Sequence, residues 1–147
     1  MTEFDIQKIL FSHFLTLNEF SGIRYLKQND KGDYTNVHFP NVPFTAPQDK
    51  RWYDLNFINA EPSDAAMMEG SQYRFTGVLK IAIHTPTDAQ EDEAETKYRW
   101  IAKLFNHADL DYIDIMRVYI STRGNDADTN SYRIQITIDW TADIDKE

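Results

Sequence analysis

Residues 131–142, SYRIQITIDWTA, alternate between apolar and polar side chains over their whole length. In an extended chain, successive side chains point to opposite sides. One side would carry Tyr132, Ile134, Ile136, Ile138 and Trp140, and the other Arg133, Gln135, Thr137 and Asp139. A two-residue period of this length predicts a β-strand that buries one face and leaves the other polar.

Three further segments share this alternation: residues 51–60, 72–84 and 113–123. The last of these would place Met116 with Val118 and Ile120 on one face. The turn-rich sequence GNDADTN joins it to the strand at 131–142, which predicts a hairpin. The polar sequence EPSDAAMMEGS predicts a second hairpin, with a long loop, between the other two strands.

Two segments have helical spacing instead, residues 3–18 and 88–106. Apolar residues recur in each at intervals of three and four, so each helix would have one apolar face that must dock on another element. Gly22 is suited to a left-handed cap after the first helix, and Thr87 with Gln90 matches a capping box before the second. Residues 23–27 are expected to form a short strand.

These elements predict an α+β fold with two layers: a mainly antiparallel sheet with two amphipathic helices packed on one face. A length of 147 residues fits a single domain that spans residues 1–147.

Residues 28–50 contain three prolines, Pro40, Pro43 and Pro47, which disfavour regular structure. An irregular segment of this length is uncommon in a compact domain unless it has a function. Its aromatic residues indicate that this segment packs against another surface, which is either the protein's own core or a neighbouring subunit.

The composition excludes several classes of function. The chain has 24 acidic and 15 basic residues, a formal charge of −9, which is a poor match to the outside of a nucleic acid duplex. The absence of cysteine excludes disulfides, thiolate catalysis and cysteine-based metal sites. No run approaches the roughly 20 apolar residues of a membrane span, and the acidic N-terminus is unlike a signal peptide. A soluble protein made in a cytoplasm is therefore expected.

No motif predicts a catalytic, metal-binding or cofactor-binding residue. Asp126, Asp128 and Asn130 have the spacing of a calcium loop, but Ser131 stands where that loop needs glycine. The acidic residues near the start of the second helix complement its dipole. His84 near Asp88 leaves an acid–base pair as an alternative.

Four short motifs follow the N-terminal helix in a fixed order. They are FPNVPF (39–44), WYDLNF (52–57), RFTGVL (74–79) and IAKLF (101–105). In this order they resemble the phage tail terminator-like proteins, a family related to minor tail protein U of phage lambda. The resemblance covers roughly residues 3–142.

The resemblance implies a structural protein of the virion, assembled in the host cytoplasm, and no enzyme. Family members form a ring, commonly of six subunits, that caps the head-proximal end of the tail tube. The implied partners are other copies of the chain, the tail tube protein and a head-completion protein. DNA would pass through the lumen without sequence-specific binding, and no membrane or cofactor is involved.

Four residues are candidates for the contact between subunits. Phe44 and Trp52 are large aromatic residues of the kind that anchor interfaces, although packing within their own core is the alternative. Arg74 and Arg133 belong to the polar face of the sheet, which is either solvated or meets another copy.

Other functions remain open at this stage. A head–tail connector, neck protein or other minor tail component fits the same resemblance. A small α+β enzyme that uses His84 and Asp88, or a monomeric ligand-binding domain, belongs to another class.

Overall fold

The computed structural model describes residues 3–59, 63–64, 72–89, 91–106, 108–110 and 112–145. Helices and strands follow one another along the chain in the order α1 (Glu3–Phe14), α2 (Leu17–Ser21), β1 (Val37–His38), β2 (Trp52–Asn59), β3 (Ser63–Asp64), β4 (Gln72–Pro86), α3 (Glu91–Asn106), β5 (Ile113–Asp126) and β6 (Ser131–Asp145).

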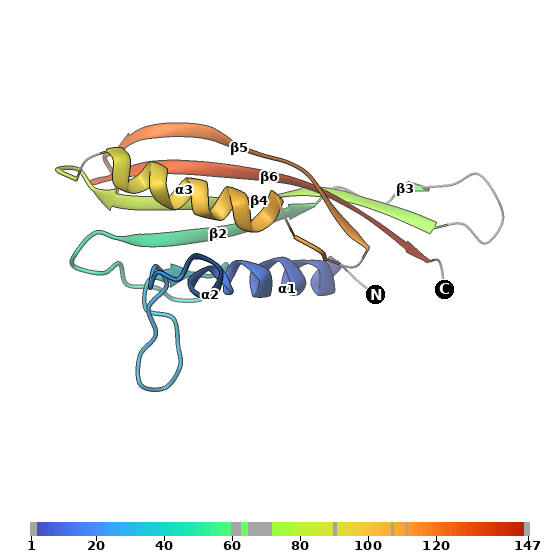
Figure 1. The fold of residues 1–147 in the computed structure, drawn as a ribbon, viewed down its shortest axis with the longest axis horizontal. Coiled ribbons are helices and arrows are strands. Elements are labelled where there is room, and N and C mark those ends of the chain that lie inside the picture. Colours follow the sequence, from blue (N-terminus) through green and yellow to red (C-terminus); the bar gives the residue numbers. More distant parts are fainter. Residues whose placement is uncertain are drawn as a thin grey trace.

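The strands form one sheet in the order β1-β2-β4-β6-β5, and β3 pairs with β4 outside this path. The pairs β2–β4, β4–β6 and β5–β6 are antiparallel, whereas β1 runs parallel to β2. Figure 1 shows α3 lying along the sheet and α1 running beside β2, and both helices contact the strands there. The prediction of an α+β fold with a mainly antiparallel sheet is confirmed.

Both long helices pack on the apolar face of the sheet, where Tyr53 of β2 marks their meeting point. The Phe14 ring of α1 meets the Tyr53 ring edge-on at 5.7 Å, and the Lys97 ammonium of α3 lies 5.6 Å from the same ring. The largest fully buried side chains come from this layer, among them Trp140, Phe14 and Phe105. Burial of each such side chain stabilises the fold by roughly 1.5–3 kcal/mol.

The N-terminal helix is shorter than the predicted 3–18. It ends at Phe14, and the Thr16 hydroxyl donates a hydrogen bond of 2.6 Å to the His13 carbonyl where the chain turns. After the short α2, Gly22 adopts a left-handed conformation with φ of 73°, and its N–H donates to the Asn18 carbonyl. The predicted glycine cap is therefore confirmed.

The predicted strand at 23–27 is wrong, because side-chain amides bond this backbone in place of a neighbouring strand. Asn18 bonds both the N–H and the C=O of Leu26, at 2.8 and 2.7 Å. Asn36 accepts from the N–H of Lys27 and donates to the C=O of Tyr25. The short edge strand is β1 instead.

The second predicted helix begins at Glu91 instead of residue 88. Residues 87–89 form a turn in which the Ala89 N–H donates to the Pro86 carbonyl. Gln90 lies outside the described residues, so the predicted capping box stays a prediction.

The strands of both predicted hairpins pair antiparallel, whereas most of the predicted loop at residues 61–71 lies outside the described residues. The strands β4 and β6 are longer than their alternating sequences predict, and they extend past the helices toward the C-terminal end of the chain (Figure 1). The register of β5 against β6 shifts twice, between Ile115 and Arg117 and between Ile120 and Thr122.

Candidate functional site

The sheet face opposite the helices is polar. The strand register shows which of its residues lie near each of its two ends. Trp52, His84 and Arg133 are neighbours in one transverse row of Cα partners across β2, β4 and β6. Six residues further along β2, Ile58 lies in another row, with Val78. At about 3.3 Å per residue, the two rows are roughly 20 Å apart.

The first end holds a chain of hydrogen bonds around His84. Its Nε2 lies 2.6 Å from one carboxylate oxygen of Asp54, and its Nδ1 lies 2.9 Å from the Ser131 hydroxyl. The second oxygen of Asp54 lies 2.8 Å from Nδ1 of His38. The Ser131 hydroxyl is also 2.6 Å from the hydroxyl of Thr129. We refer to His38, Asp54, His84 and Ser131 as the histidine network.

Aromatic rings cover this network. The Trp52 ring stacks on His84 with centroids 4.0 Å apart, and Phe44 stacks on His38 at 4.8 Å. Phe44 and Trp52 are themselves 6.5 Å apart. The irregular segment at 28–50 therefore packs on its own sheet through Phe44. Its contact with a neighbouring subunit stays a prediction.

The network holds the Asp54 carboxylate in its charged form. Burial acts to raise the pKa of Asp54, but hydrogen bonds and charge interactions with His84 and His38 outweigh burial and lower it. The alternative pairing of His84 with Asp88 is wrong, because both ring nitrogens of His84 bond Asp54 and Ser131 while Asp88 is exposed.

A serine, a histidine and an aspartate in hydrogen-bond contact are also the components of a nucleophilic triad. Here the Ser131 residue is 0% exposed and His84 is 1% exposed. A substrate has no route to the Ser131 oxygen in this arrangement. The geometry therefore supports a structural role, in which the network fixes the strand ends beneath the loop.

The four candidate interface residues fall in different parts of the polar face. Phe44 is half-buried, whereas Trp52 is only 3% exposed and packs against the rings of His84 and Phe44. Arg74 is exposed at the far end, where its guanidinium makes two hydrogen bonds to Asp143, at 2.9 and 3.2 Å. Their role in a subunit contact stays a prediction.

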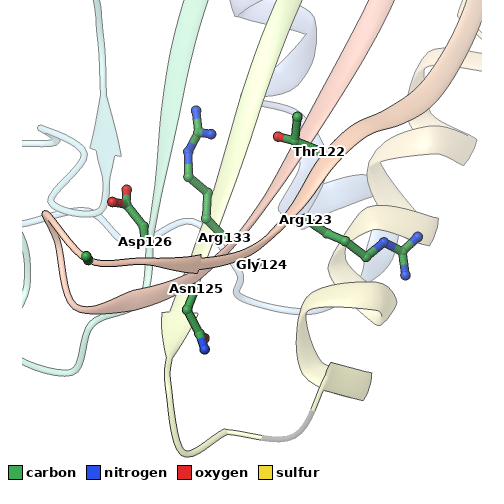
Figure 2. Close-up of a pocket in the computed structure, with 7 residues that line it drawn as sticks. Thr122, Arg123, Gly124, Asn125, Asp126 and Arg133 are labelled. Carbon is green, nitrogen blue, oxygen red and sulfur yellow. The ribbon is translucent and has the colours of Figure 1, made fainter.

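Arg133 lies at the edge of an open hollow of about 320 Å³ formed by the β5–β6 hairpin. In Figure 2, Arg133, Thr122 and Asp126 point to one side of the hairpin, and Arg123 and Asn125 to the other. Arg133 donates to the Gln135 side-chain oxygen at 2.6 Å, and Arg123 pairs with Glu95 of α3 at 3.2 Å.

The far end of the polar face holds a shallow groove of about 720 Å³, which we call the Met116 groove. Its large apolar lining residues are Val78, Met116 and Trp140, and the Arg74–Asp143 ion pair also lines it. Asp139, also in the lining, pairs with Arg117 at 2.8 Å.

The alternation of 113–123 predicted Met116 on the same face as Val118 and Ile120, but that prediction is wrong. The register shifts between Ile115 and Arg117, so Met116 has no Cα partner on β6 and leaves the alternation of the strand. Met116 is 65% exposed. A bulge of this kind has no signature in the hydrophobic pattern.

Within the described residues, no group of three or more histidine, cysteine or acidic side chains is placed to hold a metal ion. In the same part of the chain, no helix is both long enough and apolar enough to cross a membrane.

Comparison with known proteins shows the family. No curated protein matches the sequence. Twelve chains of solved structures match, and one of them covers 96% of this chain and 96% of its own length, with a TM-score of 0.56 and 15% sequence identity, which shows a shared fold alone. A family model described as phage tail terminator protein matches residues 23–140, which includes β1, β2, β4, α3, β5 and most of β6. The resemblance seen in the short motifs is thus confirmed, and the chain belongs to the phage tail terminator family, whose members are structural components of the phage tail.

Proposed function

We propose that this protein ends the growth of a phage tail tube by forming a ring on its head-proximal end. The observation that carries the proposal is the family-model match across residues 23–140. The ring, of about six subunits by analogy with the family, would stop further addition of tube protein and present a surface to the head-completion protein. Assembly would take place in the host cytoplasm.

The surface chemistry supports a role in assembly. The polar sheet face carries matched ion pairs at one end and the histidine network at the other, where Ser131 is fully buried. The net charge of −9 also suits a ring around DNA, because negative walls repel phosphates and allow the duplex to slide.

A phage deletion tests the proposal. Without the terminator, tube protein should continue to add, and electron microscopy should show abnormally long tails without heads. Adding the purified protein early in a tube assembly reaction should fix tube length. Tails of normal length in the deletion, with heads that fail to join, would identify a connector or neck protein instead.

A further inference from the structure

A continuous chain of hydrogen bonds runs from the interior of the sheet to the turn between β5 and β6. It starts at Asp54, whose carboxylate lies 2.6 Å from Nε2 of His84. Nδ1 of the same ring lies 2.9 Å from the Ser131 hydroxyl, which lies 2.6 Å from the hydroxyl of Thr129. His84 and Ser131 are buried, whereas Thr129 is half-buried in the turn at 127–130. The chain therefore connects a buried ring to a surface turn.

The charge of Asp54 fixes the direction of each hydrogen bond in this chain. A carboxylate can only accept, so Nε2 of His84 carries the hydrogen of the bond that joins them. When His84 is neutral, its Nδ1 has no hydrogen and accepts one from Ser131. A hydroxyl has a single hydrogen to donate, so Ser131 in turn accepts from Thr129.

One added proton reverses the last two bonds. A proton that His84 takes from the solvent binds to Nδ1, which then donates to Ser131. The Ser131 hydrogen is released from His84 and is donated to Thr129. The hydrogen of Thr129 turns away from Ser131 to another acceptor. Thr129 thus changes from a donor to an acceptor in response to a charge on the buried ring.

We propose that this chain is a proton-operated switch, through which the protonation of His84 changes the hydrogen bonding of the β5–β6 turn. Histidine is the side chain that ordinarily changes its charge between about pH 5 and pH 8. The proposal concerns the isolated chain and goes beyond the role of the protein in tail assembly.

The charged groups around His84 act on the added proton in opposite directions. Asp54 of β2 favours it, because opposite charges attract. His38 of β1, when charged, and Arg133, the Cα partner of His84 on β6, oppose it. The loop at 39–48 contains no charged residue. The remaining acids at this end of the sheet lie at turns: Asp88, Asp126 and Asp128.

The turn can respond to this change because its backbone is held on both sides of Thr129. The Asp128 N–H donates to the Asp126 carboxylate at 3.0 Å, and Asn130 adopts a left-handed conformation with φ of 50°. A new partner for the Thr129 hydroxyl therefore changes the surroundings of the neighbouring amides. Ala127 and Asp128 are exposed, so the change reaches the surface of the protein.

Nuclear magnetic resonance of the purified, isotope-labelled chain tests the switch between about pH 8 and about pH 5. The ring nitrogens of His84 report its protonation, and the backbone amides of 127–130 report the state of the turn. We expect both sets of signals to move with the same midpoint. Because the purified chain is sufficient, the result does not depend on the proposed ring.

Two variants interrupt the chain of hydrogen bonds. Thr129→Val keeps the shape of the side chain and removes its hydroxyl, so His84 should still titrate while the turn amides no longer follow it. Ser131→Ala should give the same result from a buried position. Ser121→Ala is the matched control, because it removes a hydroxyl of β5 that bonds the Gln135 carbonyl and has no contact with His84. The response of the turn should remain in this control.

A third variant identifies the ring that responds. His38 is a second histidine bonded to Asp54, and in His38→Gln the amide can still donate to Asp54 but does not titrate. A turn response that persists in this variant supports the switch. A response lost with His38 would overturn it, as would a His84 ring that stays in one protonation state over the whole range. Turn amides that still follow His84 in Thr129→Val would show that its charge acts through space, and would also overturn the proposal.

Discussion

At the scale of single residues, Asp54 is the centre of the histidine network because two histidines share its carboxylate. Asp54→Asn removes the negative charge and leaves His84 with a weaker, neutral partner in a buried position. Hydrogen bonds to charged groups contribute about 1.5–3 kcal/mol each, so we expect the free energy of unfolding to fall by about 2–3 kcal/mol. Urea unfolding at neutral pH measures this. Asp143→Asn, which breaks an exposed ion pair, is the control and should cost less than about 1 kcal/mol.

The same residue gives a prediction for pH. Because the pKa of Asp54 is lowered from its ordinary value of 3.8, its charged form stabilises the folded state. This contribution is complete above the ordinary value and is lost as the pH falls through the folded-state pKa. The stability difference between the natural chain and Asp54→Asn should therefore be present at about pH 5 and shrink as the pH falls below about 4. Unfolding curves over this acidic range test the prediction, and a difference that grows below about pH 4 would contradict it.

The partners of His84 could not be predicted from nearby sequence. Sequence proximity favours an acid–base pair with Asp88, four residues away, whereas the hydrogen-bond partners Asp54 and Ser131 lie 30 and 47 residues away. The strand register alone makes them neighbours: His84 is the Cα partner of Trp52, and Asp54 is two residues further along β2. Alternation predicts which face a side chain takes, but the partner along that face depends on register.

At the scale of elements, the loop at residues 39–50 packs on the sheet through the ring of Phe44. Phe44→Ala removes the stacking on His38, and because Phe44 is only half-buried we expect a modest cost of about 1–2 kcal/mol. Phe105→Ala, at a fully buried position of α3, should cost about 3–5 kcal/mol. Hydrogen exchange should show faster exchange of backbone amides in 39–50 for Phe44→Ala, with the central strands unchanged. Unchanged protection of 39–50 would show that other contacts hold the loop.

Elements with long periodic patterns were predictable, and those without were not. The strand at 131–142 and the helix stripe that includes Ile101 and Phe105 were predicted because each repeats its spacing over several turns or pleats. The segment at 23–27 is too short to establish a period, and the amides of Asn18 and Asn36 take its backbone bonds.

At the scale of the whole molecule, the charge of −9 opposes association of identical chains. Repulsion between exposed charges is screened over about 30 Å at 0.01 M salt and about 3 Å at 1 M. We therefore expect a monomer at low protein concentration, and larger species as protein or salt concentration rises. Sedimentation velocity over a range of protein and salt concentrations measures the size of these species. Asp30 and Asp128 are exposed acids, so the double variant Asp30→Asn with Asp128→Asn should promote association at low salt and have little effect at high salt. A tight hexamer at every concentration would contradict the expected monomer. A ring that dissociates when salt is added would show instead that attractive charge pairs hold the subunits together.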